Sequence, residues 1–403
     1  MKEESYMADI KNTLGLYLHI PFCRSKCIYC DFYSLPTKSD AEYKRYINSL
    51  ILHMEDYSAA ASNMLIDTIF IGGGTPSVIP TKNMIELING AYHNFNVTSD
   101  AEITMEANPA TIDRAAMKKY VGEGVTRFSF GLQSANDREL KALSRIHSFD
   151  EFVDTFNDAR KAKCGNINVD IMFGLPGQTK ESLMNTLREL TALDPEHISM
   201  YGLKIEEGTP IAEIADTMQL PEEDEEFEMY LMAIEYLDAH GYKQYEISNF
   251  AKTGYECKHN LKYWNCEPYL GLGPAAHSYF NGERFSFKRD AQTYMNALEL
   301  LDPAADITDE RYEVRDKDRM GEYIMLQFRL CSGLDTAKFK IRFGRDFEKM
   351  YSNALNVYID NGFMTLRNGC YSFTPKGMYV SNYILAAMLD FDENKNDQIN
   401  AGT

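Results

Sequence analysis

The sequence has neither a long apolar stretch nor an excess of basic residues. No apolar run approaches the roughly 20 residues that a membrane-spanning helix needs, so we expect no integral membrane segment. Asp and Glu number 60 against 41 Lys and Arg, which gives a formal net charge of −19. Nucleic acids and anionic membranes both attract basic surfaces, so we expect neither as a partner. The acidic balance is typical of a protein with small-molecule or protein partners.

Several motifs are also missing. The first residues, 1–12, contain no apolar h-region, so we expect no secretory signal and predict a cytoplasmic protein. No G-x-G-x-x-G follows the first apolar run, which weakens an interpretation as a dinucleotide-binding protein. No C-x-x-C-H occurs, so covalent attachment of a c-type haem is not indicated.

Six short apolar runs alternate with amphipathic segments along the first half of the chain. Several are continuous rather than alternating, which is typical of parallel strands covered on both faces. A strand followed by a helix, repeated six times, favours a partial or full β/α barrel over a Rossmann sheet. Asp40 and Thr179 are expected to cap the helices that follow them. The runs lie at 15–22, 68–73, 102–108, 127–133, 168–176 and 197–205.

The length and the change of character along the chain predict three units. Residues 1–250 carry the β/α pattern, and residues 251–300 form a connecting segment rich in aromatic residues and glycine. Residues 301–403 are interpreted as helices followed by a hairpin around Asn368–Gly369, a strong turn signal. We therefore expect an α/β fold, a partial (β/α) barrel with a C-terminal winged-helix-like domain.

Three of the eight cysteines, Cys23, Cys27 and Cys30, are spaced C-x3-C-x2-C just past the first apolar run. In a reducing compartment, this spacing favours metal binding over disulfides. Buried thiols are one alternative, although polar residues surround the triplet, and a zinc site with His19 as fourth ligand is another. A [4Fe–4S] cluster fits three thiolates better, because its fourth iron stays open for an exchangeable ligand.

The triplet, with Tyr29 before its last cysteine, resembles the radical S-adenosylmethionine (SAM) superfamily. Five further stretches follow in the order of its oxygen-independent coproporphyrinogen III oxidase (HemN-like) group. The H-N-x-x-Y-W motif within "CKHNLKYWNC" (257–266) resembles HemW, the haem chaperone branch of that group. The ordered set covers most of the chain and is far more specific than any single motif. The five stretches are "GGGTPS" (72–77), "MEANP" (105–109), "SFGLQSAN" (129–136), "LSRIH" (143–147) and "VDIMFGLPGQT" (169–179).

The resemblance implies two cofactors, a [4Fe–4S] cluster on the three cysteines and SAM on the open iron. Glycines at 72–74 let the backbone approach a ligand closely, although a tight turn would explain them as well. Glu106 and Asp170 can accept hydrogen bonds from ribose or amine groups, and Arg145 can pair with the carboxylate of SAM. The implied SAM contacts are Tyr17, Tyr29, Gly74, Thr75, Glu106, Gln133, Arg145 and Asp170.

The H-N-x-x-Y-W motif has two interpretations. His259 can be an axial haem ligand, with Tyr263 and Trp264 packed on the macrocycle. Alternatively, His259 holds a loop in place and the two aromatic residues fill the core beneath it. His277 is a weaker alternative haem ligand.

The other five cysteines are separate from the triplet. Cys164, Cys331 and Cys370 are interpreted as buried thiols, whereas Cys257 and Cys266 flank the H-N-x-x-Y-W motif without an assigned role.

Two functions compete. A haem chaperone would bind haem as cargo and deliver it to an unknown acceptor protein, with cluster and SAM in a supporting role. An oxygen-independent coproporphyrinogen III oxidase would instead decarboxylate its substrate to protoporphyrinogen IX. The oxidases have another cysteine where this chain has Phe32, and a long N-terminal extension where this chain has a short one. These departures and the HNLKYW stretch favour a chaperone without oxidase activity. The acidic balance argues against a third function, a DNA-binding winged-helix regulator.

Overall fold

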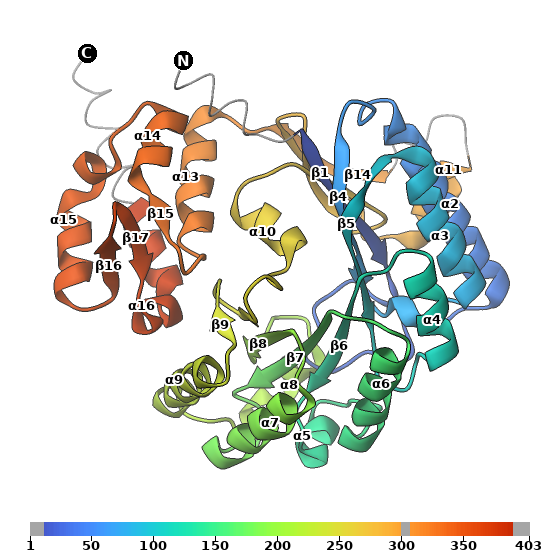
Figure 1. Cartoon of the computed structure of the whole chain (residues 1–403), viewed down its shortest axis with the longest axis horizontal. Helices are drawn as coiled ribbons and strands as arrows, with labels where there is room; N and C mark the ends of the chain where they lie inside the picture. The colour runs from blue at the N-terminus through green and yellow to red at the C-terminus, as the bar shows by residue number, and fades with distance from the viewer. Residues whose placement is uncertain (1–11, 300–306, 390–403) are drawn as a thin grey trace.

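The computed structural model describes residues 12–299 and 307–389 (Figure 1). Within these ranges, a twelve-stranded sheet runs in the order β14-β13-β12-β11-β1-β4-β5-β6-β7-β8-β10-β9. The seven strands from β11 to β8 run parallel to one another, and all of them except β11 lie at the continuous apolar runs that predicted parallel strands. They are β11 (Tyr269–Leu272), β1 (Thr13–Ile20), β4 (Leu65–Gly73), β5 (Asn96–Ala107), β6 (Arg127–Gln133), β7 (Ile167–Phe173) and β8 (His197–Gly202).

Antiparallel strands extend the parallel part at both ends, so within the described residues the sheet is open, with β14 and β9 at its edges, and forms a partial barrel. Beyond β11 lie β12 (His277–Phe280), β13 (Glu283–Phe287) and β14 (Thr308–Glu313). Beyond β8 lie β10 (Asn249–Ala251) and β9 (Lys243–Gln244). A separate pair, β2 (Phe22–Cys23) and β3 (Leu35–Pro36), brackets the cysteine loop.

Helices cover the convex side of the sheet, and α10 lies on its concave side (Figure 1). The apolar side chains between the helices and the strands form one large core. The helices of this part are α2 (Asp40–Ser58), α3 (Thr81–Asn94), α4 (Arg114–Gly122), α5 (Asp137–Ala142), α6 (Phe149–Lys161), α7 (Lys180–Leu193), α8 (Pro210–Ile214), α9 (Glu223–Ala239), α10 (Lys258–Trp264) and α11 (Ala291–Leu298). Two single 3-10 turns are η1 (Pro76–Val78) and η2 (Ala215–Thr217).

One of the two expected helix caps is confirmed and the other is wrong. Thr179 caps α7, and its side chain accepts a hydrogen bond from the backbone N–H of Ser182. Helix α2 is capped by Ser39 rather than by Asp40, because Ser39 and Glu42 form a reciprocal capping box. Asp40 instead lies in the first turn, where its negative charge interacts favourably with the positive end of the helix dipole.

The C-terminal region has a core of its own and a three-stranded sheet, β15-β17-β16. The expected hairpin is confirmed: Asn368 and Gly369 have φ values of 52° and 79°, the left-handed pair that a tight β-turn requires. The elements are α13 (Asp316–Gln327), β15 (Leu334–Asp335), α14 (Thr336–Phe343), α15 (Phe347–Asp360), β16 (Met364–Arg367), β17 (Cys370–Phe373) and α16 (Pro375–Tyr379). The fold is therefore an α/β partial barrel with a C-terminal winged-helix-like domain.

The C-terminal region contacts the barrel through α9 and α10. The ring of Tyr379 lies 5.0 Å from that of Phe227 on α9. Gln327 donates a hydrogen bond of 3.0 Å to the carbonyl of Trp264 at the end of α10. No helix in the described ranges is long and apolar enough to cross a membrane.

Candidate functional site

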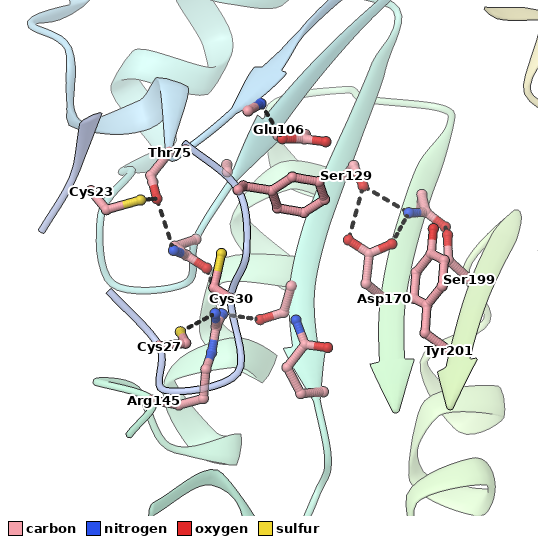
Figure 2. A pocket seen from close by; sticks show the side chains of 18 of the residues that line it. Cys23, Cys27, Cys30, Thr75, Glu106, Ser129, Arg145, Asp170, Ser199 and Tyr201 are labelled. Atoms are coloured by element: carbon pink, nitrogen blue, oxygen red, sulfur yellow. Dashed lines mark hydrogen bonds between the residues drawn. The ribbon is translucent and has the colours of Figure 1, made fainter. Parts of the chain in front are cut away.

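A cavity of about 360 Å³ opens at the carboxyl ends of the parallel strands (Figure 2). We call it the strand-end cavity. Its volume is in the range of about 300–1,000 Å³ that small-molecule sites occupy. The three cysteines of the triplet line it, together with seven of the eight expected SAM contacts. The seven are Tyr29, Gly74, Thr75, Glu106, Gln133, Arg145 and Asp170.

The three thiols reach the cavity on the loop between β2 and β3. Cys23 ends β2, and the backbone N–H of Cys30 donates to the carbonyl of Cys27 at 3.2 Å, which closes the loop into a turn. Thr75 donates to Cys23 Sγ at 3.5 Å, and Arg145 donates to Cys27 Sγ at 3.3 Å. Burial raises the pKa of the Cys23 and Cys30 thiols, so binding iron there releases protons.

The glycines at 72–74 allow β4 to pack tightly against the start of the cysteine loop. The backbone N–H of Gly74 donates to the carbonyl of Ile20 at 2.8 Å. A Cβ on Gly74 would lie 2.8 Å from the carbonyl oxygen of Phe22, and one on Gly73 would enter the ring of His19. Gly74 is therefore needed for this close approach of two backbone segments, and Gly73 leaves room for the ring of His19, whatever ligand the cavity takes.

Arg145 connects the cysteine loop to two strand ends. Besides Cys27 Sγ, its guanidinium donates to the carbonyl of Gly131 on β6 and to the side-chain oxygen of Asn108 after β5 (Figure 2). Asn108 in turn donates to Thr75 Oγ1 at 3.0 Å. The planar guanidinium of Arg145 already faces the thiols, so it can pair with a carboxylate that binds beside them.

Glu106 and Asp170 form an acidic pair deeper in the cavity. Glu106 accepts a hydrogen bond of 3.0 Å from the backbone N–H of Gly73, and Asp170 accepts bonds from Asn168 at 2.8 Å and Ser129 at 3.3 Å. Burial, together with the nearby charge of Asp170, raises the pKa of Glu106 from 4.5 to about 7. Burial also raises the pKa of Asp170. Two carboxyl groups of this kind favour a ligand that carries hydroxyl or amine donors.

Gln133 has a backbone conformation that side chains rarely adopt. Its φ is 73°, and the pairing of β6 with β7 shifts between Gly131 and Gln133. This bulge turns the side chain of Gln133 into the cavity, where it is buried. Strained backbone of this type concentrates at ligand sites, because surrounding contacts must hold it in place.

Tyr17 lies outside the strand-end cavity. It lines a second, neighbouring cavity of about 520 Å³, which we call the aromatic cavity. The hydroxyl of Tyr17 bonds to Nδ1 of His19 at 2.9 Å. His19 Nε2 bonds to the carbonyl of Tyr33 at 3.3 Å, so this histidine is held away from the cysteine triplet. The role of Tyr17 as a SAM contact stays a prediction.

The H-N-x-x-Y-W motif forms α10, and both ring nitrogens of His259 are bonded inside the protein. Nδ1 pairs with Thr68 Oγ1 at 2.8 Å and Nε2 with the hydroxyl of Tyr263 at 2.8 Å. Burial lowers the pKa of His259 to about 3. This geometry favours the interpretation in which His259 holds the local structure. Asn260 lines the strand-end cavity, and Tyr263 lines the aromatic cavity.

The five other cysteines do not line the strand-end cavity. Cys164 and Cys257 are buried, and Cys257 Sγ donates to Glu102 at 3.5 Å. Cys266 and Cys331 pack against the C-terminal core, and Cys370 is half-buried on β17.

Sequence reasoning missed much of one wall of the strand-end cavity. Arg127, Asn168, Ser199 and Tyr201 line it, on the three strands β6, β7 and β8. Figure 2 shows Tyr201, Ser199 and Asp170 side by side on β7 and β8. A signal was present on β7, because Asn168 lies two residues before Asp170, whereas the bulge after Gly131 separates Arg127 from Gln133. Alternate residues of a strand face the same side.

The donor set fits a cluster and a polar ligand. Three thiols without a fourth line one end of the cavity, and an arginine pairs with one of them. Arg127 is only 2% exposed, and its buried Nε has no hydrogen-bond partner in the described ranges. This N–H group can therefore donate to a ligand in the cavity. No three His, Cys, Asp or Glu side chains in those ranges converge on a single metal ion.

Comparisons with known proteins agree on one family. The radical SAM superfamily matches residues 17–190, and the HemN C-terminal domain matches residues 314–380. Proteins named Heme chaperone HemW from Bacillus subtilis and Escherichia coli are 33% and 34% identical to this chain, over 93% of it and 98% of each relative. The solved coproporphyrinogen III oxidase HemN of Escherichia coli, a radical SAM enzyme, has a TM-score of 0.81 at 19% identity. That match covers 96% of this chain and 92% of HemN, and it shows the shared fold.

Proposed function

We propose that this chain, which belongs to the HemW family of radical SAM proteins, binds haem and passes it to an acceptor protein. A [4Fe–4S] cluster on Cys23, Cys27 and Cys30 and a SAM molecule beside it complete the proposal. The observation that carries it is the similarity to proteins named as haem chaperones along 93% of the chain. The strand-end cavity, with its three thiols, supports the two cofactors.

The chain's own residues would bind and orient these groups. When bound, the cluster and SAM supply one-electron chemistry at the open iron. Arg145, already directed at Cys27, would pair with the carboxylate of SAM. Glu106 would accept from a ribose hydroxyl or the amine, and at neutral pH it is poised between its two protonation states. Phe32, which replaces the extra cysteine of the oxidases, lines the mouth of the cavity.

The cluster is tested by counting iron and sulfide after anaerobic reconstitution. We expect about four of each per chain, and replacement of any cysteine of the triplet by alanine should abolish them. Cys164→Ala, Cys331→Ala and Cys370→Ala are matched controls, because none of these residues lines the strand-end cavity. A single tightly held zinc without broad visible absorbance would contradict the assignment. SAM should then change the EPR spectrum of the reduced cluster.

The function is tested by two anaerobic assays. Titration with haem should saturate at one per chain, and transfer to an apo-haem protein should be faster than passive release. The same preparation, supplied with SAM and a reductant, should release no carbon dioxide from coproporphyrinogen III. Catalytic turnover in the second assay would replace the chaperone by the oxidase, whose fold this chain shares.

A further inference from the structure

We infer that the aromatic cavity is the haem site, with His277 as the axial ligand and Arg289 as the partner of a propionate. The inference rests on the proposed haem-binding function and locates it. The cavity of about 520 Å³ is lined by residues of the neighbouring strands β1, β11, β12, β13 and β14, and it shares Phe32 with the strand-end cavity. Its volume is in the range of sites for cofactor-sized ligands.

Aromatic rings from several elements form the walls of this cavity. Tyr17 comes from β1, Tyr33 from the end of the cysteine loop, and Tyr263 and Tyr269 from α10 and β11. The rings of Tyr263 and Tyr269 pack edge to face, with centroids 4.5 Å apart. A flat apolar macrocycle can pack against ring faces and edges of this kind, while hydroxyl groups remain at its rim.

His277 offers a free imidazole at the cavity. It begins β12 and is exposed, and its ring makes no hydrogen bond to any residue that the structure describes. The other histidine of the cavity, His19, has both nitrogens bonded, to Tyr17 and Tyr33. His259, from the H-N-x-x-Y-W motif, is also fully bonded. A neutral imidazole with a free nitrogen is the usual protein ligand of haem iron.

Arg289 supplies the charge that a propionate needs. One of its terminal nitrogens donates to the carbonyl of Asp31 at 2.9 Å, and the guanidinium makes no other hydrogen bond in the described ranges. It is exposed at the cavity, where a carboxylate can accept the remaining donors. Asp309 also lines the cavity and would repel a propionate, so the propionate is placed at Arg289 and away from Asp309.

The same geometry gives the H-N-x-x-Y-W motif a role at this site. His259 Nε2 bonds to the hydroxyl of Tyr263, and Tyr263 forms part of the cavity wall. His259 therefore acts as a positioning residue for the wall, and its removal should weaken haem binding without removing the axial ligand. Phe32, which is 67% exposed, lines both cavities. Haem in the aromatic cavity would therefore lie on the other side of this ring from the cluster cysteines.

The ligand is tested on anaerobically purified, cluster-loaded protein titrated with ferric haem. We expect His277→Ala to lose the imidazole signature in the Soret band and in EPR, and to weaken binding about tenfold or more. Added free imidazole should restore the signature. His259→Ala should keep it, and His93→Ala, an exposed histidine on α3, should match the wild type in every measurement.

The propionate contact is tested with haem and its dimethyl ester. Arg289→Ala should weaken haem binding about tenfold and leave the affinity for the ester unchanged, because the ester has no carboxylate to pair. Equal losses for the two ligands would overturn this contact.

These measurements distinguish a failure of the inferred haem site from a failure of the proposed haem-binding function. If the wild type binds haem with an imidazole signature and His277→Ala keeps it, or if His259→Ala loses it, the inferred site is overturned while haem binding stands. A thiolate spectrum in the wild type also overturns the site. If the wild type binds no stoichiometric haem at all, the proposed function itself fails.

Discussion

At the scale of single residues, the strand-end cavity contains charged groups that lie close enough to affect one another's protonation and ligand binding. Arg145 faces the thiols, whereas Glu106 and Asp170 share a buried region with raised pKa values. In a buried region, charge pairs are screened less by water than at the surface, so removing one partner changes ligand affinity measurably.

Arg145→Ala should weaken SAM binding by roughly 1.5–3 kcal/mol, because a charge-assisted pair with a carboxylate is lost. The measurement is calorimetric titration of cluster-loaded protein with SAM. Arg138→Ala, an exposed arginine on the neighbouring helix α5, is the matched control. An unchanged affinity in Arg145→Ala would remove this residue from the SAM site.

SAM affinity should rise as the pH increases from about 6 to 8 and then level off. Glu106 has a pKa of about 7, so it is largely protonated at pH 6, and only its charged form attracts the cationic groups of SAM. Titrations at several pH values check the trend. Glu106→Gln should remove this part of the pH dependence, whereas an identical profile in the variant would assign it to another group.

At the scale of elements, the close approach of β4 to β1 and β2 positions the cysteine loop. Gly74 N and Thr75 N donate to the carbonyls of Ile20 and Phe22, both at 2.8 Å. This contact brings Thr75 to Cys23 and holds the loop over the strand ends. The position of the thiols thus depends on a backbone contact between segments about 50 residues apart in sequence.

Gly74→Ala should lower the iron content after reconstitution and destabilise the protein by about 1–3 kcal/mol. Its Cβ would lie 2.8 Å from the carbonyl oxygen of Phe22, so the backbone must shift. Gly122→Ala is the matched control: it lies at the end of α4 with nothing within 4 Å, and it should keep full iron content. Chemical denaturation and iron analysis of both variants check the prediction; normal iron in Gly74→Ala would contradict it.

At the scale of the whole molecule, the eight histidines divide into buried and exposed groups. Burial lowers the pKa of His19 and His147 to about 4, and that of His53 and His259 to about 3. Burial also places the pKa of His197 well below 6.5. These side chains lie in the barrel part of the chain, so protonating them opposes folding there.

The free energy of unfolding should fall steeply as the pH drops from 6.5 towards 4. In this window the unfolded chain binds protons at these histidines and the folded chain does not, so stability rises with pH. Each such histidine adds a slope of about 1.4 kcal/mol per pH unit. Denaturation at several pH values should show a shallower slope in His53→Phe and an unchanged slope in the exposed control His93→Gln. Equal slopes in the two variants would contradict the prediction.

Much of the site could be read from the sequence, because its signals are local. Continuous apolar runs predicted six of the seven parallel strands, and the ordered motifs predicted which residues contact SAM. Seven of eight expected SAM contacts line one cavity with the three cysteines. The turn at Asn368–Gly369 and the cap at Thr179 are equally local and were also confirmed.

Only the tertiary structure decided which partners the ambiguous residues have. His259 is bonded by Thr68, which is 191 residues away, and Tyr17 faces the aromatic cavity rather than the strand-end cavity. Ser199 lines the strand-end cavity because the pairing of β7 with β8 places it beside Asp170. The sequence by itself determined six of the parallel strands and the family, because these follow from periodicity and motifs along the chain. The tertiary structure decided which ring nitrogens are bonded and which face ligand space, because that depends on packing between segments distant in sequence.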